Sequence, residues 1–150
     1  MSVFVDSTTI LYMFDRRDPE KTATCTAWLS HLLASSQLRM NLQVLNETYA
    51  VVSRKPHFRE ARPLIRDFVI EHLTWCEGTI DIDVIRAAWA LQDRYGIQFW
   101  DSILLASARM TNCTHFLSED LNDGQVYGGV TVVNPFRHSP EDVLGRALPR

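Results

Sequence analysis

The chain has 150 residues, a length typical of one domain, and about two thirds of its unfolded surface can be buried at that size. Its hydrophobic content of 46% and charged content of 22% exclude the disordered and fibrous classes, and its net charge of −3 argues against a uniformly basic surface. The three cysteines, Cys25, Cys76 and Cys113, lie far apart without a CxxC pair, which argues against a disulfide framework and a zinc site. We therefore expect a single domain over residues 1–150.

The sequence also limits where the protein can reside. No run of about 18 uncharged apolar residues occurs, so we expect no membrane association. The N-terminal stretch MSVFVDSTTILYMFDRR lacks the basic start and the small-residue cleavage site of a secretory signal. These features predict a cytoplasmic protein.

The N-terminal part of the chain alternates short apolar runs with helical patterns. Residues 2–6 (SVFVD) predict a strand, and residues 7–14 (STTILYMF) predict a helix that follows it directly. A second helix is expected from about Pro19, because proline is favoured in the first helical turn. The run over residues 38–43 (LRMNLQ) predicts a second short strand.

The middle of the chain is mostly helical in pattern. Residues 44–55 and 58–73 predict two helices that form a hairpin divided at Pro56. Residues 73–77 (LTWCE) predict a short strand. Residues 81–96 then carry apolar side chains on one helical face and end in a glycine, which is typical of a helix C-terminus.

The C-terminal part returns to strands. A helix is expected from residue 99 to about residue 111, beginning with the sequence FWDSILLASA. Strands are expected over residues 114–120 (THFLSED) and 130–135 (VTVVNP), separated by a loop over residues 121–129. The tail from His138 shows no clear period beyond one turn.

This order of elements predicts an α/β fold. Short strands that are apolar on both faces and alternate with helices indicate a parallel sheet covered on both sides. We therefore expect a three-layer α/β/α sandwich around a mostly parallel sheet of four to five strands. Open sheets of this type carry their sites at the carboxyl ends of the strands.

Four acids occupy equivalent positions in this predicted fold. Asp6 and Asp120 end strands, while Glu47 and Asp101 lie in the first turns of helices that begin at the same edge of the sheet. Four carboxylates brought together repel one another unless a cation neutralises them, and Mg²⁺ or Mn²⁺ prefers such oxygen ligands. The pattern predicts a metal site that polarises a scissile phosphate and activates water for attack.

Each acid also has a purely structural explanation. Asp6 and Asp101 could cap the helices at whose starts they lie, and the acidic stretch SEDLND could be only a solvated turn. Within that stretch the fourth ligand stays open among Glu119, Asp120 and Asp123. Glu47 is harder to explain without a partner, because it lies on a mostly apolar helix.

The basic residues are unevenly distributed. Thirteen of the 15 are arginines, whose planar guanidinium suits phosphate oxygens. A cluster within residues 54–66 predicts a surface that binds phosphate groups, made by Arg54, Lys55, Arg59 and Arg62. The alternative is a solvated helix face with acidic partners such as Glu60 and Asp67.

These residues give the sequence a resemblance to the PIN-domain nucleases, especially the VapC-type toxins of bacterial toxin–antitoxin modules. The similar segments are FVDSTTIL, QVLNETYAVVSR, FWDSILLASA, HFLSEDLNDG and VTVVNPF. The resemblance assigns the catalytic metal ligands to Asp6, Glu47, Asp101 and Asp120, with Ser7 and Ser118 in support and Asp123 as an alternative ligand. It also implies Mg²⁺ or Mn²⁺ as cofactor, endoribonuclease activity, a homodimer and a cognate antitoxin that blocks the site.

Other classes fit the sequence less well. The main alternative is a catalytically inactive PIN-like module that binds RNA or protein. A phosphoacceptor receiver domain needs a lysine after its last strand, and none follows Lys55. The six glycines form neither a GxxxxGK nor a GxGxxG motif, which disfavours nucleotide-binding folds, and Thr8 stands where a haloacid-dehalogenase-like phosphatase has its second aspartate.

Overall fold

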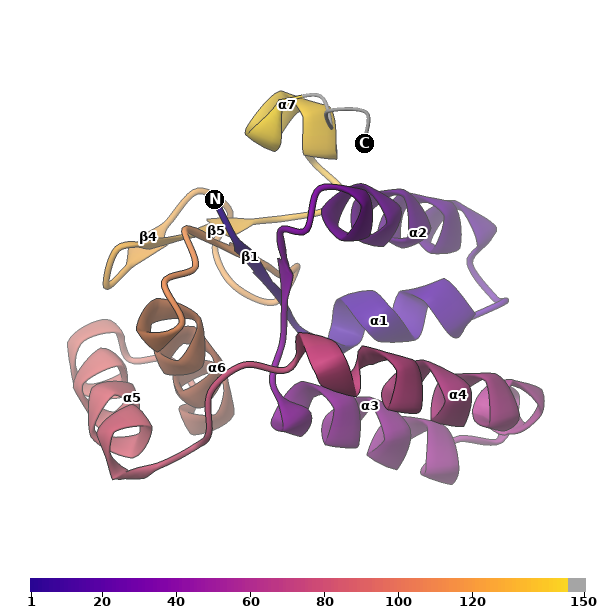
Figure 1. The fold of residues 1–150 in the computed structure, drawn as a ribbon, viewed down its shortest axis with the longest axis horizontal. Helices are drawn as coiled ribbons and strands as arrows, with labels where there is room; N and C mark the ends of the chain where they lie inside the picture. The colour runs from indigo at the N-terminus through magenta and orange to yellow at the C-terminus, as the bar shows by residue number, and fades with distance from the viewer. Residues whose placement is uncertain (146–150) are drawn as a thin grey trace.

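A computed structural model describes residues 1–145, and its centre is a five-stranded sheet with the order β2-β1-β3-β5-β4 (Figure 1). The strands are β1 (Val3–Val5), β2 (Leu38–Arg39), β3 (His115–Leu117), β4 (Val126–Tyr127) and β5 (Val130–Val133). All neighbours are parallel except β4 and β5, which are antiparallel. The predicted mostly parallel sheet is confirmed.

The middle of the sheet is fully buried. Phe4 on β1 pairs with Arg39 on β2 and with Phe116 on β3, and the two phenylalanine rings stack with centroids 5.7 Å apart. Phe4 is 0% exposed. Because helices cover both faces, the central strand β1 is apolar along its whole length rather than alternating.

The helices form two groups on opposite sides of the strands. In Figure 1, α1 to α4 lie to the right of the strands, and α5 and α6 lie as a pair at the lower left, below β4 and β5. The α-helices are α1 (Ser7–Phe14), α2 (Pro19–Ala34), α3 (Leu42–Arg54), α4 (Arg62–His72), α5 (Ile82–Tyr95), α6 (Phe99–Met110) and α7 (Pro140–Leu144). The 3₁₀ helices are η1 (Pro56–Ala61) and η2 (Leu73–Trp75). The predicted three-layer α/β/α arrangement is confirmed.

Local sequence explains where the helices begin and end. Asp6, Asp18, Asn41 and Asp81 cap α1, α2, α3 and α5 by accepting a hydrogen bond from a backbone N–H in the first turn. Gly96 ends α5 with φ +65°, a left-handed conformation that glycine adopts without steric cost. These boundaries place the starts of α1, α3 and α6 at the carboxyl edge of the sheet.

Four details differ from the sequence predictions. Of the strand expected over residues 38–43 only Leu38–Arg39 forms β2, because Asn41 caps α3, which already begins at Leu42. The strand expected at residues 73–77 is wrong, because that segment forms η2 and then only one bridge, between Met40 and Cys76. Its side chains are half-buried or exposed, and the segment lies beside the edge strand β2, where no further strand of residues 1–145 follows. The expected loop 121–129 contains β4, which turns back onto β5 through Gly128 and Gly129, both with positive φ. Within residues 58–73 a 3₁₀ turn precedes α4, which begins next to Pro63.

The core has a main cluster around the sheet and a smaller one between α3 and α4. The smaller cluster consists of Val52, Phe58, Ala61 and Ile65.

Cys25 and Cys113 are buried and Cys76 is half-buried, and all three are free thiols. Over residues 1–145, no helix has both the length and the apolar character needed to cross a membrane.

Candidate functional site

Asp6 lies between β1 and α1 and is almost fully buried, with 6% of its surface exposed. Its Oδ1 atom accepts hydrogen bonds from the Thr9 backbone N–H at 3.1 Å and from the Thr9 hydroxyl at 3.0 Å, and Ser118 also hydrogen-bonds to it. Burial raises the pKa of Asp6 to about 7 despite these bonds, and the nearby Asp120 carboxylate adds to the rise. Asp6 therefore caps α1, and no cation of residues 1–145 neutralises the charge of its carboxylate.

Glu47 reaches the same region from α3. Its Oε2 atom accepts a hydrogen bond from the Ser7 hydroxyl at 3.3 Å, and its Oε1 atom accepts one from the Gln43 amide at 3.0 Å. Gln43 lies one turn earlier on the same helix, while Ser7 comes from the start of α1. The two bonds fix the Glu47 carboxylate against the end of β1.

Asp101 stands in the first turn of α6 and is half-buried. Burial raises its pKa, and the Asp120 and Glu47 carboxylates raise it further. In residues 1–145, neither the side chain of the N-cap residue Gln98 nor the Asp101 carboxylate makes a capping hydrogen bond to the first turn of α6. Capping therefore does not explain Asp101.

Asp120 follows β3 and is exposed. Its backbone N–H donates to the Ser118 hydroxyl at 3.1 Å, and its Oδ2 atom accepts from the Thr8 hydroxyl at 3.2 Å. Asp120 also lines a surface hollow together with Asp101. Ser118, predicted to support the site, contacts both Asp6 and the Asp120 backbone.

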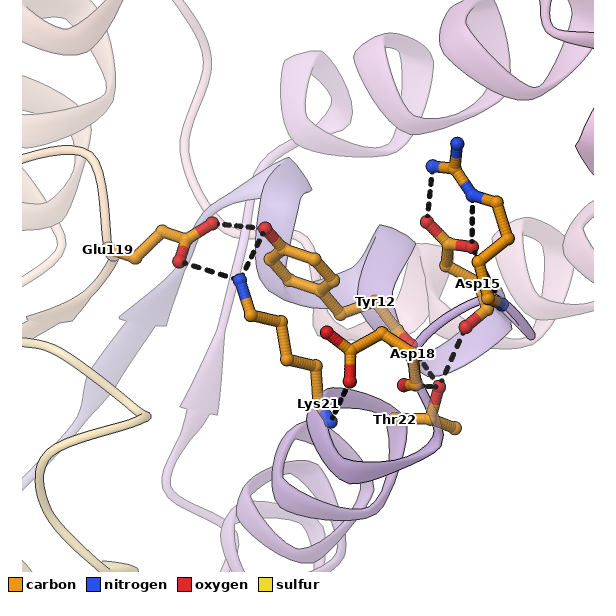
Figure 2. Close-up of polar contacts among 7 residues, drawn as sticks. Tyr12, Asp15, Asp18, Lys21, Thr22 and Glu119 are labelled. Atoms are coloured by element: carbon orange, nitrogen blue, oxygen red, sulfur yellow. Dashed lines mark hydrogen bonds and ion pairs between the residues drawn. The ribbon is translucent and has the colours of Figure 1, made fainter.

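The other two acids of the same loop are bound elsewhere. Glu119 accepts a hydrogen bond from the Tyr12 hydroxyl through Oε1, and its Oε2 lies 3.5 Å from Lys21 Nζ. Figure 2 shows both contacts. Asp123 accepts the Asn134 backbone N–H at 2.8 Å and contacts His138 Nε2 at 2.7 Å. Of the three candidates for the fourth ligand, Asp120 is the one whose carboxylate faces the other site acids.

A run of three hydroxyl residues organises this cluster, and the sequence interpretation missed two of them. Ser7 donates to Glu47, Thr8 donates to Asp120 and Thr9 donates to Asp6. Each hydroxyl thus orients a different acid from a separate part of the chain. The STT triplet directly after Asp6 was the available signal for this role, whereas nothing in the sequence pointed to Gln43.

The electrostatic influences on the pKa values connect the four predicted acids. Asp120 acts on both Asp6 and Asp101, and Glu47 acts on Asp101. In the described part of the chain, however, no three His, Cys, Asp or Glu side chains are placed so that they could hold a metal ion directly. The acids are therefore neighbours at one sheet edge without forming a closed cage.

This arrangement limits the kind of cation that the site suits. The donors are carboxylate oxygens, which match hard divalent ions, and Mg²⁺ usually keeps several waters and uses only one or two carboxylates. The unneutralised burial of Asp6 and Asp101 is an independent sign that the cluster fits a positive charge. Asp6, Glu47, Asp101 and Asp120 are the residues that could hold such an ion, partly through water.

The predicted basic surface is only partly free. Arg54, Lys55 and Arg59 are exposed. Arg62 instead donates from Nε to the Val52 carbonyl at 3.0 Å, which satisfies the C-terminal end of α3. Arg62 is thus engaged in packing the helical hairpin, and none of the four residues lines the hollow beside Asp101.

Comparison with known proteins identifies the family to which this fold and this cluster of acids belong. The model of the PIN domain family matches residues 3–126, and the chain belongs to this family. No curated protein matches the sequence significantly.

Solved structures agree on the fold. A toxin–antitoxin complex from Klebsiella pneumoniae has 20% identity and a TM-score of 0.59, with 89% of this chain and 98% of that chain covered. VapC20 of Mycobacterium tuberculosis, described as a sarcin–ricin loop cleaving toxin, has 19% identity and a TM-score of 0.58, with 87% and 99% covered. FitAcB from Neisseria gonorrhoeae has 13% identity and a TM-score of 0.65, with 91% and 99% covered. At these identities the likeness shows a shared PIN-type fold.

Proposed function

We propose that this PIN-domain protein is a Mg²⁺- or Mn²⁺-dependent endoribonuclease and the toxin of a toxin–antitoxin pair. The proposal depends on four acids that come together from four parts of the chain: Asp6, Glu47, Asp101 and Asp120. Three of them accept hydrogen bonds from hydroxyl groups, and within residues 1–145 none of the four has a cation as a hydrogen-bond or ion-pair partner. Such a set is costly in the absence of a counter-charge, so its presence at one edge of the sheet supports a ligand that supplies one.

The residues of the chain prepare the site for phosphodiester hydrolysis. When bound, a divalent cation supplies polarisation of the phosphate and a more acidic water. Ser7, Thr8 and Thr9 hold three of the acids in place, which lowers the cost of ordering them at the moment of binding. Lys21 and Tyr12 keep Glu119 turned away, so that the loop after β3 presents Asp120 alone.

The substrate and the partners are supported by the structural relatives. One of them is described as a sarcin–ricin loop cleaving toxin, and another is a toxin–antitoxin complex. We extend RNA as substrate, a cognate antitoxin protein, a homodimer, a single domain over residues 1–150 and a cytoplasmic location to this chain as parts of the same proposal. The exposed Arg54, Lys55 and Arg59 are proposed to contact the RNA backbone.

The deciding experiment incubates the purified protein with total RNA in Mn²⁺, in Mg²⁺ and in EDTA, and maps the new ends by sequencing. We expect discrete cuts with either metal and none with EDTA. The alternative, an inactive PIN-like module that binds RNA or protein, predicts RNA retention without new ends under all three conditions.

The toxin assignment needs a separate test. Induced expression is expected to arrest growth, and co-expression of the small protein encoded next to it is expected to restore growth. Metal-dependent cleavage without growth arrest would place the protein among nucleases that are not toxins.

A further inference from the structure

We propose that the hollow beside Asp101 and Asp120 is a nucleobase subsite that selects adenine next to the scissile phosphate, with Gln98 as the specificity-determining residue. The inference rests on the proposed ribonuclease function, because it names the part of the substrate that lies beside the acids. It concerns residues between α5 and α6 and after β3 that the metal site does not use.

The hollow has a size suited to a nucleoside. Its volume is about 480 Å³, within the range of about 300–1,000 Å³ common for small-molecule sites. Asp101 and Asp120 form one part of its lining, and Gly96, Ile97, Gln98 and Leu121 form the rest. At Gly96 a side chain would meet nothing within 4 Å, so the turn leaves this rim open.

Gln98 has an anchored backbone and, within residues 1–145, a side-chain amide that has no hydrogen-bond partner. Its carbonyl accepts hydrogen bonds from the Ser102 N–H at 3.0 Å and from the Ser102 hydroxyl at 2.9 Å, which anchors the residue at the start of α6. In the part of the chain that the structure describes, its side-chain amide makes no hydrogen bond, and the residue is exposed. An amide that offers one donor and one acceptor side by side matches the N6 and N7 edge of adenine.

The rest of the lining favours a base over a phosphate. Ile97 and Leu121 are half-buried and pack against the main core, so they offer fixed apolar surface to the face of a base. Among residues 1–145, no basic side chain lines the hollow. The occupant of this chemistry is a neutral base with an amino group on its edge.

The first test maps cleavage of a random-sequence RNA pool in Mn²⁺ by the parent protein, Gln98→Ala, Gln98→Glu and the control Gln92→Ala. Gln92 is the same residue type on α5 but does not line the hollow. We expect the parent and Gln92→Ala to prefer adenine at one position beside the cut by roughly tenfold. Gln98→Ala is expected to lose that preference, and Gln98→Glu to shift it to cytosine, whose amino group a carboxylate accepts.

The second test measures binding without cleavage, so that the subsite and the nuclease proposal can fail separately. Adenosine 5′-monophosphate is titrated into the parent protein while the Gln98 side-chain amide is followed by NMR, with cytidine 5′-monophosphate as the comparison. We expect a shift of this resonance with the adenine nucleotide that is at least several-fold larger than with the cytosine nucleotide. Equal shifts, or cleavage preferences that Gln98→Ala leaves intact, overturn the subsite. Failure of the parent to cut any RNA overturns the nuclease proposal, and the NMR titration then decides the subsite alone.

Discussion

Two neighbouring groups of acids in this molecule have opposite electrostatic surroundings. In the first, shown in Figure 2, Asp15 binds Arg17 through two oxygens at 2.8 and 2.9 Å, and Glu119 faces Lys21. In the second, Asp6 and Asp101 have other carboxylates as their charged neighbours. The Arg17 guanidinium lowers the pKa of Asp15, whereas burial raises the pKa values of Asp6 and Asp101.

This difference separates acids that are paired within the chain from the acids of the candidate site more clearly than burial does. Asp15 and Asp6 are both nearly buried, with 8% and 6% of their surfaces exposed. Asp15 is satisfied within the chain, because its charge and its hydrogen bonds have partners. Asp6 has partners for its hydrogen bonds but not for its charge, and a bound cation would supply what is missing.

The largest expected effect comes from removing one unpaired charge at the hollow. Asp101→Asn is expected to lower the rate of RNA cleavage in Mn²⁺ at least about 100-fold, because the site loses a charge that holds the cation. The matched control is Asp83→Asn, an exposed acid in the first turn of α5, which should cleave like the parent. Both rates are measured on one defined RNA oligonucleotide, and thermal unfolding verifies that both variants fold. Undiminished cleavage by folded Asp101→Asn would refute the site assignment.

The second prediction concerns the stability of the metal-free protein as a function of pH. The pKa of Asp6 is raised from 3.8 to about 7 in the folded state, so the folded form binds this proton more tightly than the unfolded form. Stability from this group is complete below about pH 4 and is lost as the pH rises through 7, by up to about 4 kcal/mol.

Urea unfolding in EDTA between pH 4 and 8 measures this loss. Asp6→Asn keeps an acceptor for Thr9 but removes the titration, so the stability of this variant is expected to vary less with pH. Mn²⁺ is expected to restore the stability of the parent at pH 8 and to leave Asp6→Asn less affected. Identical pH profiles for parent and variant would show that Asp6 does not carry an unpaired charge.

The third prediction converts a paired acid into an unpaired one. Lys21→Met removes the cation from Glu119 and the contacts that Lys21 makes with the Tyr12 and Phe136 rings. Because the pair is partly exposed, we expect a loss of only about 1 kcal/mol in the free energy of unfolding. The double variant Lys21→Met with Glu119→Gln is expected to regain part of it, since no lone carboxylate remains. Additive losses in urea unfolding would mean that the two residues do not act as a pair.

The smallest effect is expected for the exposed cations of the hairpin. Arg54→Ala with Arg59→Ala should weaken RNA binding a few-fold and flatten its salt dependence by roughly 0.7 in log–log slope for each lost phosphate contact. Arg62→Ala is the contrasting variant, because loss of its bond to Val52 should cost about 1 kcal/mol of stability with little change in the salt slope. Fluorescence anisotropy at several salt concentrations measures both. An unchanged slope in the double variant would remove these arginines from the RNA path.

Most of the fold followed from local pattern. The apolar strand runs, the cap at Asp6 and the helix stop at Gly96 are short-range signals, and β1, α1 and α5 appear where these signals predicted them. The cap at Asn41 was missed, because residues 38–43 were expected to form a strand and α3 already begins at Leu42. The strand expected at residues 73–77 failed, because Leu73–Trp75 form a 3₁₀ helix and leave only the bridge between Met40 and Cys76 beside the edge strand. The β4 strand was missed for the converse reason, since its residues gain their pairing from the turn at Gly128 and Gly129.

The residues of the candidate site were predictable from the sequence, but which of the nearby acids are paired with other side chains was not. The positions of Asp6, Glu47, Asp101 and Asp120 at equivalent ends of elements follow from topology, because helices that return along a parallel sheet begin at its carboxyl edge. The choice among Glu119, Asp120 and Asp123 did not follow, since it depends on Tyr12, Lys21, Asn134 and His138. Those contacts join segments about 10 to 110 residues apart.

The sequence by itself determined the PIN-type α/β fold and the four acids at one edge of the sheet, because both depend on periodicity and on the order of elements. Only the tertiary structure decided which acids are neutralised and which are not, and that Arg62 packs while Arg54 and Arg59 face solvent. The physical reason is that the charge state of a carboxyl group depends on its dehydration and on cations within a few ångströms, and these distances exist only in the folded chain.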